Sequence, residues 1–186
     1  MSDVSNVHRS LARINDQIRT LTNHRDRTML EIYRDHWWAE VHNDVDAIMA
    51  TLPPDKVSYL FEGTRLFFKE RFAFTDTSSA RKLYEGAAGS LPMAGPFEQE
   101  RFAFADWGMT FEGILTAIVR GGSLHGLEQT LDADALYMIS WRAATVHPMD
   151  VERRLMLGEH VYTGDVVRLA LADDDVLRQM YQDAID

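Results

Sequence analysis

The chain contains no cysteine among its 186 residues. This absence excludes disulfide bonds, thiolate catalysis, and zinc or iron–sulfur sites that depend on cysteine ligands. Absence of cysteine does not fix a compartment, but it fits a cytoplasmic protein that needs no redox chemistry, and we expect that localisation.

Positive charge is also scarce, with 19 Lys and Arg residues against 29 Asp and Glu and a formal net charge of -10. Nucleic acids and anionic membrane surfaces both require concentrated Lys and Arg, so neither is an expected partner. No apolar run approaches the ~20 residues of a membrane span. The first 15 residues also lack the apolar core of a signal peptide.

Several catalytic and ligand-binding motifs are missing. The seven histidines show neither HExxH nor another paired-ligand spacing, so we expect no metal. Gly121-Gly122 is not followed by Lys and Ser or Thr, which argues against a phosphate-binding loop. No serine lies in a GxSxG context. These absences leave cofactor-free acid/base catalysis or plain binding.

The composition is 46% hydrophobic, which suits one compact domain over residues 26–186. Residues 1–25 predict an amphipathic helix that belongs to the same domain, and residues 23–26 link it to the next helix. Its apolar residues are spaced by three and four, at Val4, Val7, Leu11, Ile14, Ile18 and Leu21. The helix either packs on its own domain or pairs with a second copy.

Residues 28–52 show apolar residues at helical spacing, with a break at His42-Asn43-Asp44. Asn and Asp are poor in helix interiors and good at N-caps, so a shorter helix should begin at Asp44 or Val45. His36 lies on the apolar stripe of the longer helix. It is either a hydrogen-bonded core residue or part of a site.

The rest of the chain predicts short helices and an antiparallel meander. Before the meander we expect a strand at 56–61, an extended segment at 65–74, a helix at 80–88 and a loop at 89–96. The meander strands are expected at 97–107, 109–120, 135–146 and 151–162, with a turn at 147–150 and a terminal helix at 173–185.

The order of elements in Tyr33 to Gly63 resembles the nuclear transport factor 2-like superfamily, which includes ketosteroid isomerase, scytalone dehydratase and the SnoaL-type polyketide cyclases. Tyr84-Glu85-Gly86 and the strand pair across His147-Pro148 add to the resemblance. It implies an α+β fold in which a cone-shaped, curled antiparallel sheet of the cystatin-like type packs against helices around an apolar pocket. The helix before Arg25 is extra. Exposed sheets in this fold often pair, so a homodimer is expected.

The resemblance also locates the functional positions of the isomerases. Their phenol donor on the first helix falls at His36. Their carboxylate base on the first strand falls near Leu60, with Tyr59 and Glu62 beside it. Their later acid falls near residues 140–142, where there is no carboxylate. The steroid isomerase triad is therefore absent.

We predict His36 and Asp106 as an acid/base pair, with Tyr59 as an anion-stabilising donor. Asp106 would be a base if it pointed inward, because burial raises a carboxyl pKa. The alternative is a turn residue before Gly108.

Six further residues are predicted to bind the ligand: Tyr33, Trp37, Glu112, Tyr137, Trp141 and His160. For each there is a structural alternative: core packing for the aromatic residues, a solvated strand face for Glu112, and a dimer face for His160.

The leading hypothesis is an isomerase, cyclase or dehydratase that acts on a hydrophobic carbonyl- or hydroxyl-bearing small molecule. The alternatives are a non-catalytic binding or assembly module, and a protein that pairs through Val4 to Leu21.

Overall fold

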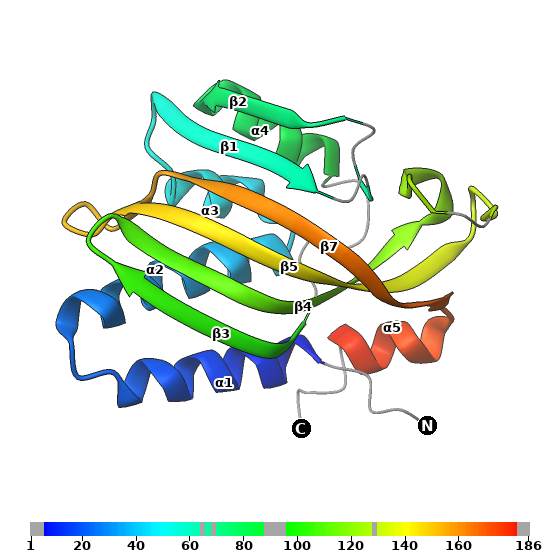
Figure 1. The fold of residues 1–186 in the computed structure, drawn as a ribbon, viewed down its shortest axis with the longest axis horizontal. Coiled ribbons are helices and arrows are strands. Elements are labelled where there is room, and N and C mark those ends of the chain that lie inside the picture. The colour runs from blue at the N-terminus through cyan, green and yellow to red at the C-terminus, as the bar shows by residue number, and fades with distance from the viewer. Residues whose placement is uncertain (1–5, 64–65, 68–69, 88–95, 128–129, 182–186) are drawn as a thin grey trace.

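The computed structural model describes residues 6–63, 66–67, 70–87, 96–127 and 130–181. Helices pack against one curled sheet (Figure 1). In chain order the elements are α1 (Val7–Thr20), α2 (His24–Val41), α3 (Val45–Ala50), β1 (Lys56–Gly63), β2 (Phe72–Asp76), α4 (Thr77–Ala87), β3 (Phe97–Ala105), β4 (Gly108–Arg120), the short 3-10 helix η1 (Gly121–Ser123), β5 (Leu136–Asp150), β6 (Leu155–Met156), β7 (Gly158–Leu171) and α5 (Asp174–Tyr181).

The strands follow the order β2-β1-β7-β5-β4-β3, and β6 pairs with the end of β5. Strands β3, β4, β5 and β7 form the predicted antiparallel meander. Strand β1 joins β7 in parallel, so the first long strand lies beside the last one. Because β2 and β3 remain edge strands in the described part of the chain, the sheet curls without closing.

The predicted break between the two central helices is confirmed. Helix α2 ends at Val41, Asn43 takes a left-handed conformation with φ 52, and the Asp44 carboxylate accepts the Ala47 N–H at 3.0 Å as the N-cap of α3. Helix α2 begins earlier than expected, because Asn23 caps it. Residues 24–26 are therefore its first turn and not a link.

Two strand boundaries differ from the sequence expectation. Strand β5 continues through the expected turn at 147–150 to Asp150, and the chain reverses at 151–154 instead. Pro148 suggested a break, but its carbonyl still accepts the Leu157 N–H at 2.7 Å. The expected strand at 151–162 is two strands, β6 and β7, and β7 runs on to Leu171.

The segment between β1 and α4 is only partly extended. Strand β2 covers Phe72–Asp76, whereas a strand was expected over 65–74. Helix α4 follows as predicted, and the Asp76 carboxylate accepts the Ser79 N–H at 2.8 Å at its start. Most of the loop expected at 89–96 lies outside the described residues. The C-terminal helix α5 is confirmed as Asp174–Tyr181.

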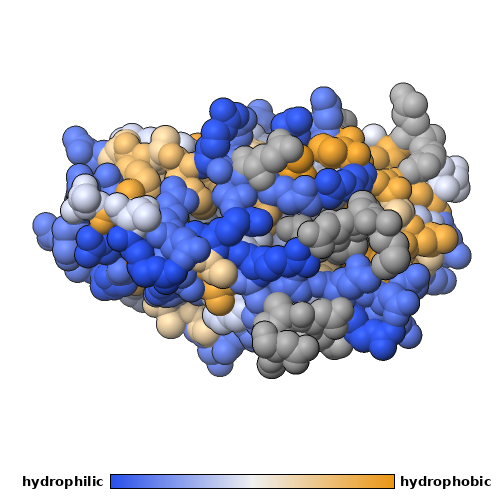
Figure 2. Space-filling view, turned by 90° about the horizontal axis from the view of Figure 1, so that it is seen from below, coloured by the Kyte–Doolittle hydropathy of each residue, from blue (hydrophilic) through white to orange (hydrophobic). Residues whose placement is uncertain are grey.

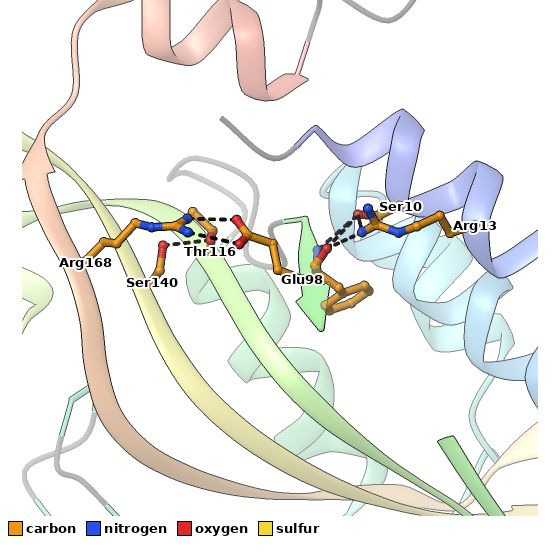
Figure 3. A network of polar contacts seen from close by, with 7 residues as sticks. Ser10, Arg13, Glu98, Thr116, Ser140 and Arg168 are labelled. Carbon is orange, nitrogen blue, oxygen red and sulfur yellow. Dashed lines mark hydrogen bonds and ion pairs between the residues drawn. The ribbon is translucent and has the colours of Figure 1, made fainter. Parts of the chain in front are cut away.

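Helix α1 is fastened to the edge strand β3 by polar contacts with the backbone of Phe97 (Figure 3). The hydroxyl of Ser10 accepts the Phe97 N–H at 3.0 Å, and Arg13 donates to the Phe97 carbonyl. The buried stripe of α1, with Val7, Ile14 and Ile18, faces its own domain. Figure 2, seen from the α1 side, shows a mainly hydrophilic surface there. The structure thus favours the reading of α1 as a helix packed on its own chain.

The face of the sheet toward α2, called the inner face here, carries two apolar clusters. The larger one joins α1, α2, α3, α4 and the strands through residues such as Met29, Trp37, Tyr59 and Phe111. The smaller one, called the Trp141 cluster, consists of Leu66, Ala117, Ile139, Trp141 and Ala143. Within the described ranges, no helix is both long and apolar enough to cross a membrane.

Candidate active site

His36 is held inside the protein by polar contacts on both ring nitrogens. Its side chain comes from the inner stripe of α2, and the residue is 3% exposed. Nδ1 lies 2.6 Å from the Thr51 hydroxyl, which also donates to the Ile48 carbonyl at 2.7 Å. The Ile48 carbonyl can only accept, so the single hydroxyl proton of Thr51 points toward it. His36 Nδ1 therefore carries the ring proton and donates it to the Thr51 oxygen, and Nε2 faces the interior.

The Nε2 side of His36 meets a hydrogen-bonded group of one carboxylate and two phenols. Nε2 lies 3.2 Å from the Tyr84 hydroxyl and 3.4 Å from Oε1 of Glu40. The Tyr84 hydroxyl donates to Glu40 at 3.1 Å and lies 2.9 Å from the Tyr59 hydroxyl. Four side chains from α2, α4 and β1 thus form one continuous polar network in the core.

Glu159 is placed beside this network by the parallel pairing of β1 with β7. It pairs with Tyr59, and parallel partners point to the same face of the sheet, so Glu159 also faces inward. Gly158 makes the approach possible, because its φ is 141 and an added Cβ would lie 2.0 Å from the Ser58 carbonyl oxygen. Glu159 is half-buried and makes no hydrogen bond to a described residue, and the charge of Glu40 acts on its carboxyl.

Burial and neighbouring charge separate the protonation states of these groups. Burial raises the pKa of Glu159 well above its ordinary value, and the charge of Glu40 raises it further. Burial also raises the pKa of Tyr33, Tyr59 and Tyr84 well above 10. The phenols are therefore hydrogen-bond donors at neutral pH, whereas Glu159 is the group suited to exchange a proton.

His147 adds a neutral imidazole to the inner face. Burial, and then the charges of His36 and His160, lower its pKa to about 3. Its Nε2 lies 2.6 Å from the Thr145 hydroxyl, and its ring meets Tyr33 edge-on at 4.9 Å. Its Nδ1 is buried without a partner in the described part of the structure.

The structure brings together His36 and Tyr59 but not Asp106. Asp106 is exposed in the turn between β3 and β4, as in the alternative reading, and its backbone carbonyl accepts from Arg25. Glu112 is also exposed, on the outer face, where Arg101 donates to it at 2.9 Å. Neither carboxylate lines the interior, because the turn and the alternation of β4 direct both to solvent.

The other predicted residues divide by sheet face. Tyr33 and Trp37 are buried on α2, and Tyr137 and Trp141 are buried on the inner face of β5. His160 is on the outer face, since it follows Glu159 on β7, and its Nε2 lies 2.8 Å from the Ser58 hydroxyl. His160 is therefore separated from the polar network by the sheet.

Sequence reasoning missed the roles of four residues. Glu40 is four residues after His36, a spacing that predicts a shared helix face. Glu159 shares a strand face with Leu157 and Val161, which predicts an inward carboxylate if that face is buried. Tyr84 sits on the apolar stripe of α4, with no local sign of its partners. The inward direction of His147 was not predicted, because a turn was expected at 147–150.

The comparisons with known proteins show the fold. No family model matches the chain, and no curated protein matches it. A candidate SnoaL-like polyketide cyclase from Shewanella putrefaciens CN-32 superposes with a TM-score of 0.58 at 14% identity, over 82% of this chain and 85% of that one. A candidate polyketide cyclase from Xanthomonas campestris pv. campestris gives 0.51 at 12% identity, over 75% and 93%. The chain thus has the cystatin-like α+β fold of the nuclear transport factor 2-like superfamily, as its sequence predicted.

Proposed function

We propose that the protein is a cofactor-free acid/base enzyme that acts on a hydrophobic carbonyl- or hydroxyl-bearing small molecule. The observation that carries this proposal is the inward carboxyl of Glu159, which lies beside Tyr59 on the inner face and has no hydrogen-bond partner in the described structure. Convergent titratable groups distinguish a catalytic interior from one that only binds. The candidate polyketide cyclases of the same fold agree with a reaction of this class.

The proposed first step is removal of a proton from the carbon next to a carbonyl. The Glu159 carboxylate takes the proton, the C–H electron pair forms a carbon–carbon double bond, and the carbonyl oxygen becomes an enolate oxygen. A carboxylate with a raised pKa is a stronger base for this step. Isomerisation, cyclisation or dehydration completes the reaction, according to where the proton returns or which group leaves.

Tyr33 is the proposed donor to the enolate oxygen. Its hydroxyl makes no hydrogen bond to a described residue, whereas Tyr59 and Tyr84 are already bonded to one another. The charge of Glu159 is the second cause of the raised pKa of Tyr33, after burial. Packing of Tyr33 against Phe111 and His147 holds its ring in place. A fixed donor where charge develops stabilises the transition state.

His36, protonated at Nε2, is proposed as the group that gives a proton to the product. Glu159 then releases to solvent the proton that it took from carbon, and His36 takes up a proton from solvent, so both groups are restored for the next turnover. Nε2 of His36 contacts both Tyr84 and Glu40, so a proton can pass among these three side chains over distances of 3.1 to 3.4 Å. Glu40 pairs with the ring when Nε2 is protonated. This assignment keeps His36 from the sequence prediction, replaces Asp106 with Glu159 as the base, and gives the donor role predicted for Tyr59 to Tyr33.

The reaction class is tested by hydrogen–deuterium exchange at carbon. A panel of hydrophobic cyclic ketones is incubated in D₂O with the protein, and loss of the α-proton signals is followed by NMR. Wild-type protein should accelerate exchange. Glu159→Gln, Tyr33→Phe and His36→Ala should each reduce the rate by roughly 10²- to 10⁴-fold, as expected for one positioned group.

Matched variants on the outer face serve as controls for that experiment. Glu112→Gln and Tyr162→Phe make the same chemical changes at exposed positions and should leave the exchange rate unchanged. Ketones that bind without exchange would contradict the enzyme proposal and favour the binding module.

We also propose a homodimer that pairs through the outer face of the sheet, where Tyr162 is exposed.

A further inference from the structure

Thr51 connects His36 to the end of helix α3. It is the C-cap residue of that helix and is half-buried. Its hydroxyl donates to the Ile48 carbonyl at 2.7 Å, and its backbone carbonyl accepts the Met156 N–H at 2.9 Å. These two bonds hold Thr51 between α3 and β6 without any help from His36. The hydroxyl oxygen is therefore a fixed acceptor for the imidazole ring.

Glu40 and Thr51 favour opposite tautomers of the neutral His36 ring. A carboxylate beside Nε2 accepts a proton held there, whereas the Thr51 oxygen accepts a proton held at Nδ1. Nδ1 lies 2.6 Å from the Thr51 oxygen, but Nε2 lies 3.4 Å from Glu40. The first distance is that of a short hydrogen bond, and the second exceeds the usual range of roughly 2.7–3.2 Å. The bond to Thr51 is therefore the stronger of the two.

Tyr84 reduces the pull of Glu40 on the ring proton. The Tyr84 hydroxyl donates to Glu40 at 3.1 Å, so the carboxylate already has a donor that is not the imidazole. The same hydroxyl lies 3.2 Å from Nε2 of His36 and can donate to that nitrogen when it carries no proton. The Nδ1–H tautomer thus finds a partner for each ring nitrogen.

We propose that Thr51 is a positioning residue, which holds the ring proton of His36 at Nδ1 and thereby restricts proton transfer to Nε2. The inference rests on the proposed function for the transfer, whereas the tautomer is a property of the folded protein. When the imidazolium gives its proton to the product, the Nε2–H bond breaks and its electron pair stays on Nε2. The neutral ring that remains carries its proton at Nδ1, where Thr51 accepts it. No change of tautomer is needed between turnovers.

Thr20 offers a matched comparison at the end of α1. Its hydroxyl donates to the Gln17 carbonyl at 2.8 Å, three residues earlier, which is the bond that Thr51 makes to Ile48. Thr20 is exposed, whereas Thr51 contacts the buried ring of His36. Valine at either position removes the same hydroxyl and the same helix-end bond. Of the two changes, Thr51→Val alone takes an acceptor away from His36.

The tautomer of His36 is read by NMR on ¹⁵N-labelled protein. Spectra that correlate the carbon-bound ring protons with both ring nitrogens distinguish the two tautomers, and they are recorded at alkaline pH, where imidazole rings are neutral. The chain has seven histidines, and the signals lost in His36→Gln identify the ring. Wild-type protein should hold the proton at Nδ1. A wild-type ring protonated at Nε2 would overturn the proposal, whether or not any variant folds.

The variant Thr51→Val keeps the shape of the side chain and removes the oxygen. The ratio of the Nδ1–H form to the Nε2–H form should then fall roughly tenfold, as expected for the loss of one hydrogen bond. Thr51→Ser restores the hydroxyl and should keep the wild-type ratio, as should Thr20→Val. Thermal unfolding shows whether each variant folds. An unchanged ratio in folded Thr51→Val, or an equal fall in Thr20→Val, would contradict the proposal.

The carbon-exchange assay separates this inference from the proposed function. If wild-type protein accelerates exchange, Thr51→Val should slow it roughly tenfold, because the productive tautomer becomes scarce by that factor, and Thr51→Ser should restore it. A tautomer that depends on Thr51 in a protein without carbon exchange would uphold the control of the ring by Thr51 while the enzyme proposal fails. Slower exchange in Thr51→Val with an unchanged tautomer would overturn this inference and leave the enzyme proposal standing.

Discussion

At the scale of single residues, Glu159 links the proposed chemistry to stability. Its pKa in the folded protein is raised above the ordinary 4.5 by burial and then by Glu40. The folded protein therefore holds this proton more tightly than the unfolded chain. Stability from this group is complete below pH 4.5 and declines as the pH rises toward the raised folded value. The protein tolerates an inward-facing carboxyl that costs stability near neutral pH, which is typical of a functional group.

Glu159→Gln should therefore stabilise the protein at higher pH. The amide keeps the shape of the side chain and never ionises, so the cost of burying the charge disappears. The midpoint of thermal unfolding should match wild type at about pH 4 and exceed it increasingly toward about pH 8. Circular dichroism at several pH values measures this. Glu112→Gln should show no such trend, and a Glu159→Gln advantage that shrank with pH would contradict the inward placement.

The sequence predicted part of the candidate site, and the reason is local. His36 lies on a stripe with 3.6-residue periodicity, so its inward direction follows from neighbours on its own helix. Glu159 was assigned to a face with Leu157 and Val161, but the buried face of β7 depends on its pairing with β1. Asp106 was predicted either to point inward as a base or to lie in a turn, and the structure places it in an exposed turn. Contacts between distant elements do not appear in any local pattern.

At the scale of elements, the joint between α1 and β3 makes a prediction. Ser10 is fully buried, and its hydroxyl accepts the Phe97 N–H at the start of an edge strand. Ser10→Ala should destabilise the protein by about 1–3 kcal/mol, because the Phe97 N–H is left buried and unpaired. Urea unfolding measures this loss. Thr22→Ala, at an exposed position between α1 and α2, should change stability little. An equal loss in both variants would contradict the role of Ser10.

The boundaries of elements were predicted where the residues carry their own signal. Asp44 caps α3 and Asp76 starts α4 through side-chain contacts with residues three positions on, so both starts were expected. The ends of β5 and β7 were not, because partner strands set them. Pro148 pairs opposite Gly108 within a long ladder, which outweighs the usual tendency of proline to end a strand.

At the scale of the whole molecule, contacts on both faces of the sheet stabilise its curvature. On the inner face α2 packs along the strands, whereas on the other face Arg168 of β7 reaches Glu98 of β3 across β5 and β4 (Figure 3). That ion pair is bidentate, at 2.8 and 3.0 Å, and it lies near the buried Thr116–Ser140 hydroxyl pair. Contacts between non-neighbouring strands favour a curved sheet over a flat one.

The proposed dimer is tested by the mass in solution. The buried stripe of α1 is already used within the chain, so pairing should depend on the outer face of the sheet. Light scattering should give twice the 21.3 kDa of one chain for wild type. Tyr162→Glu should halve that mass, and Ala12→Glu, on the exposed side of α1, should not. If Ala12→Glu disrupted the dimer and Tyr162→Glu did not, the chains would pair through α1, and the proposed outer-face interface would be wrong.

The parallel junction of β1 and β7 also determines when the interior can form during synthesis. Ser58 and His160, which hydrogen-bond across that junction, are 102 residues apart in the chain. Contacts this distant in sequence form late, after the local helices and hairpins. A nascent chain that still lacks its last strand exposes Tyr59 and Phe61 to its surroundings. The Glu159 carboxyl and the phenols therefore meet only after β7 has been synthesised, which makes a nascent chain without β7 a natural client for chaperones.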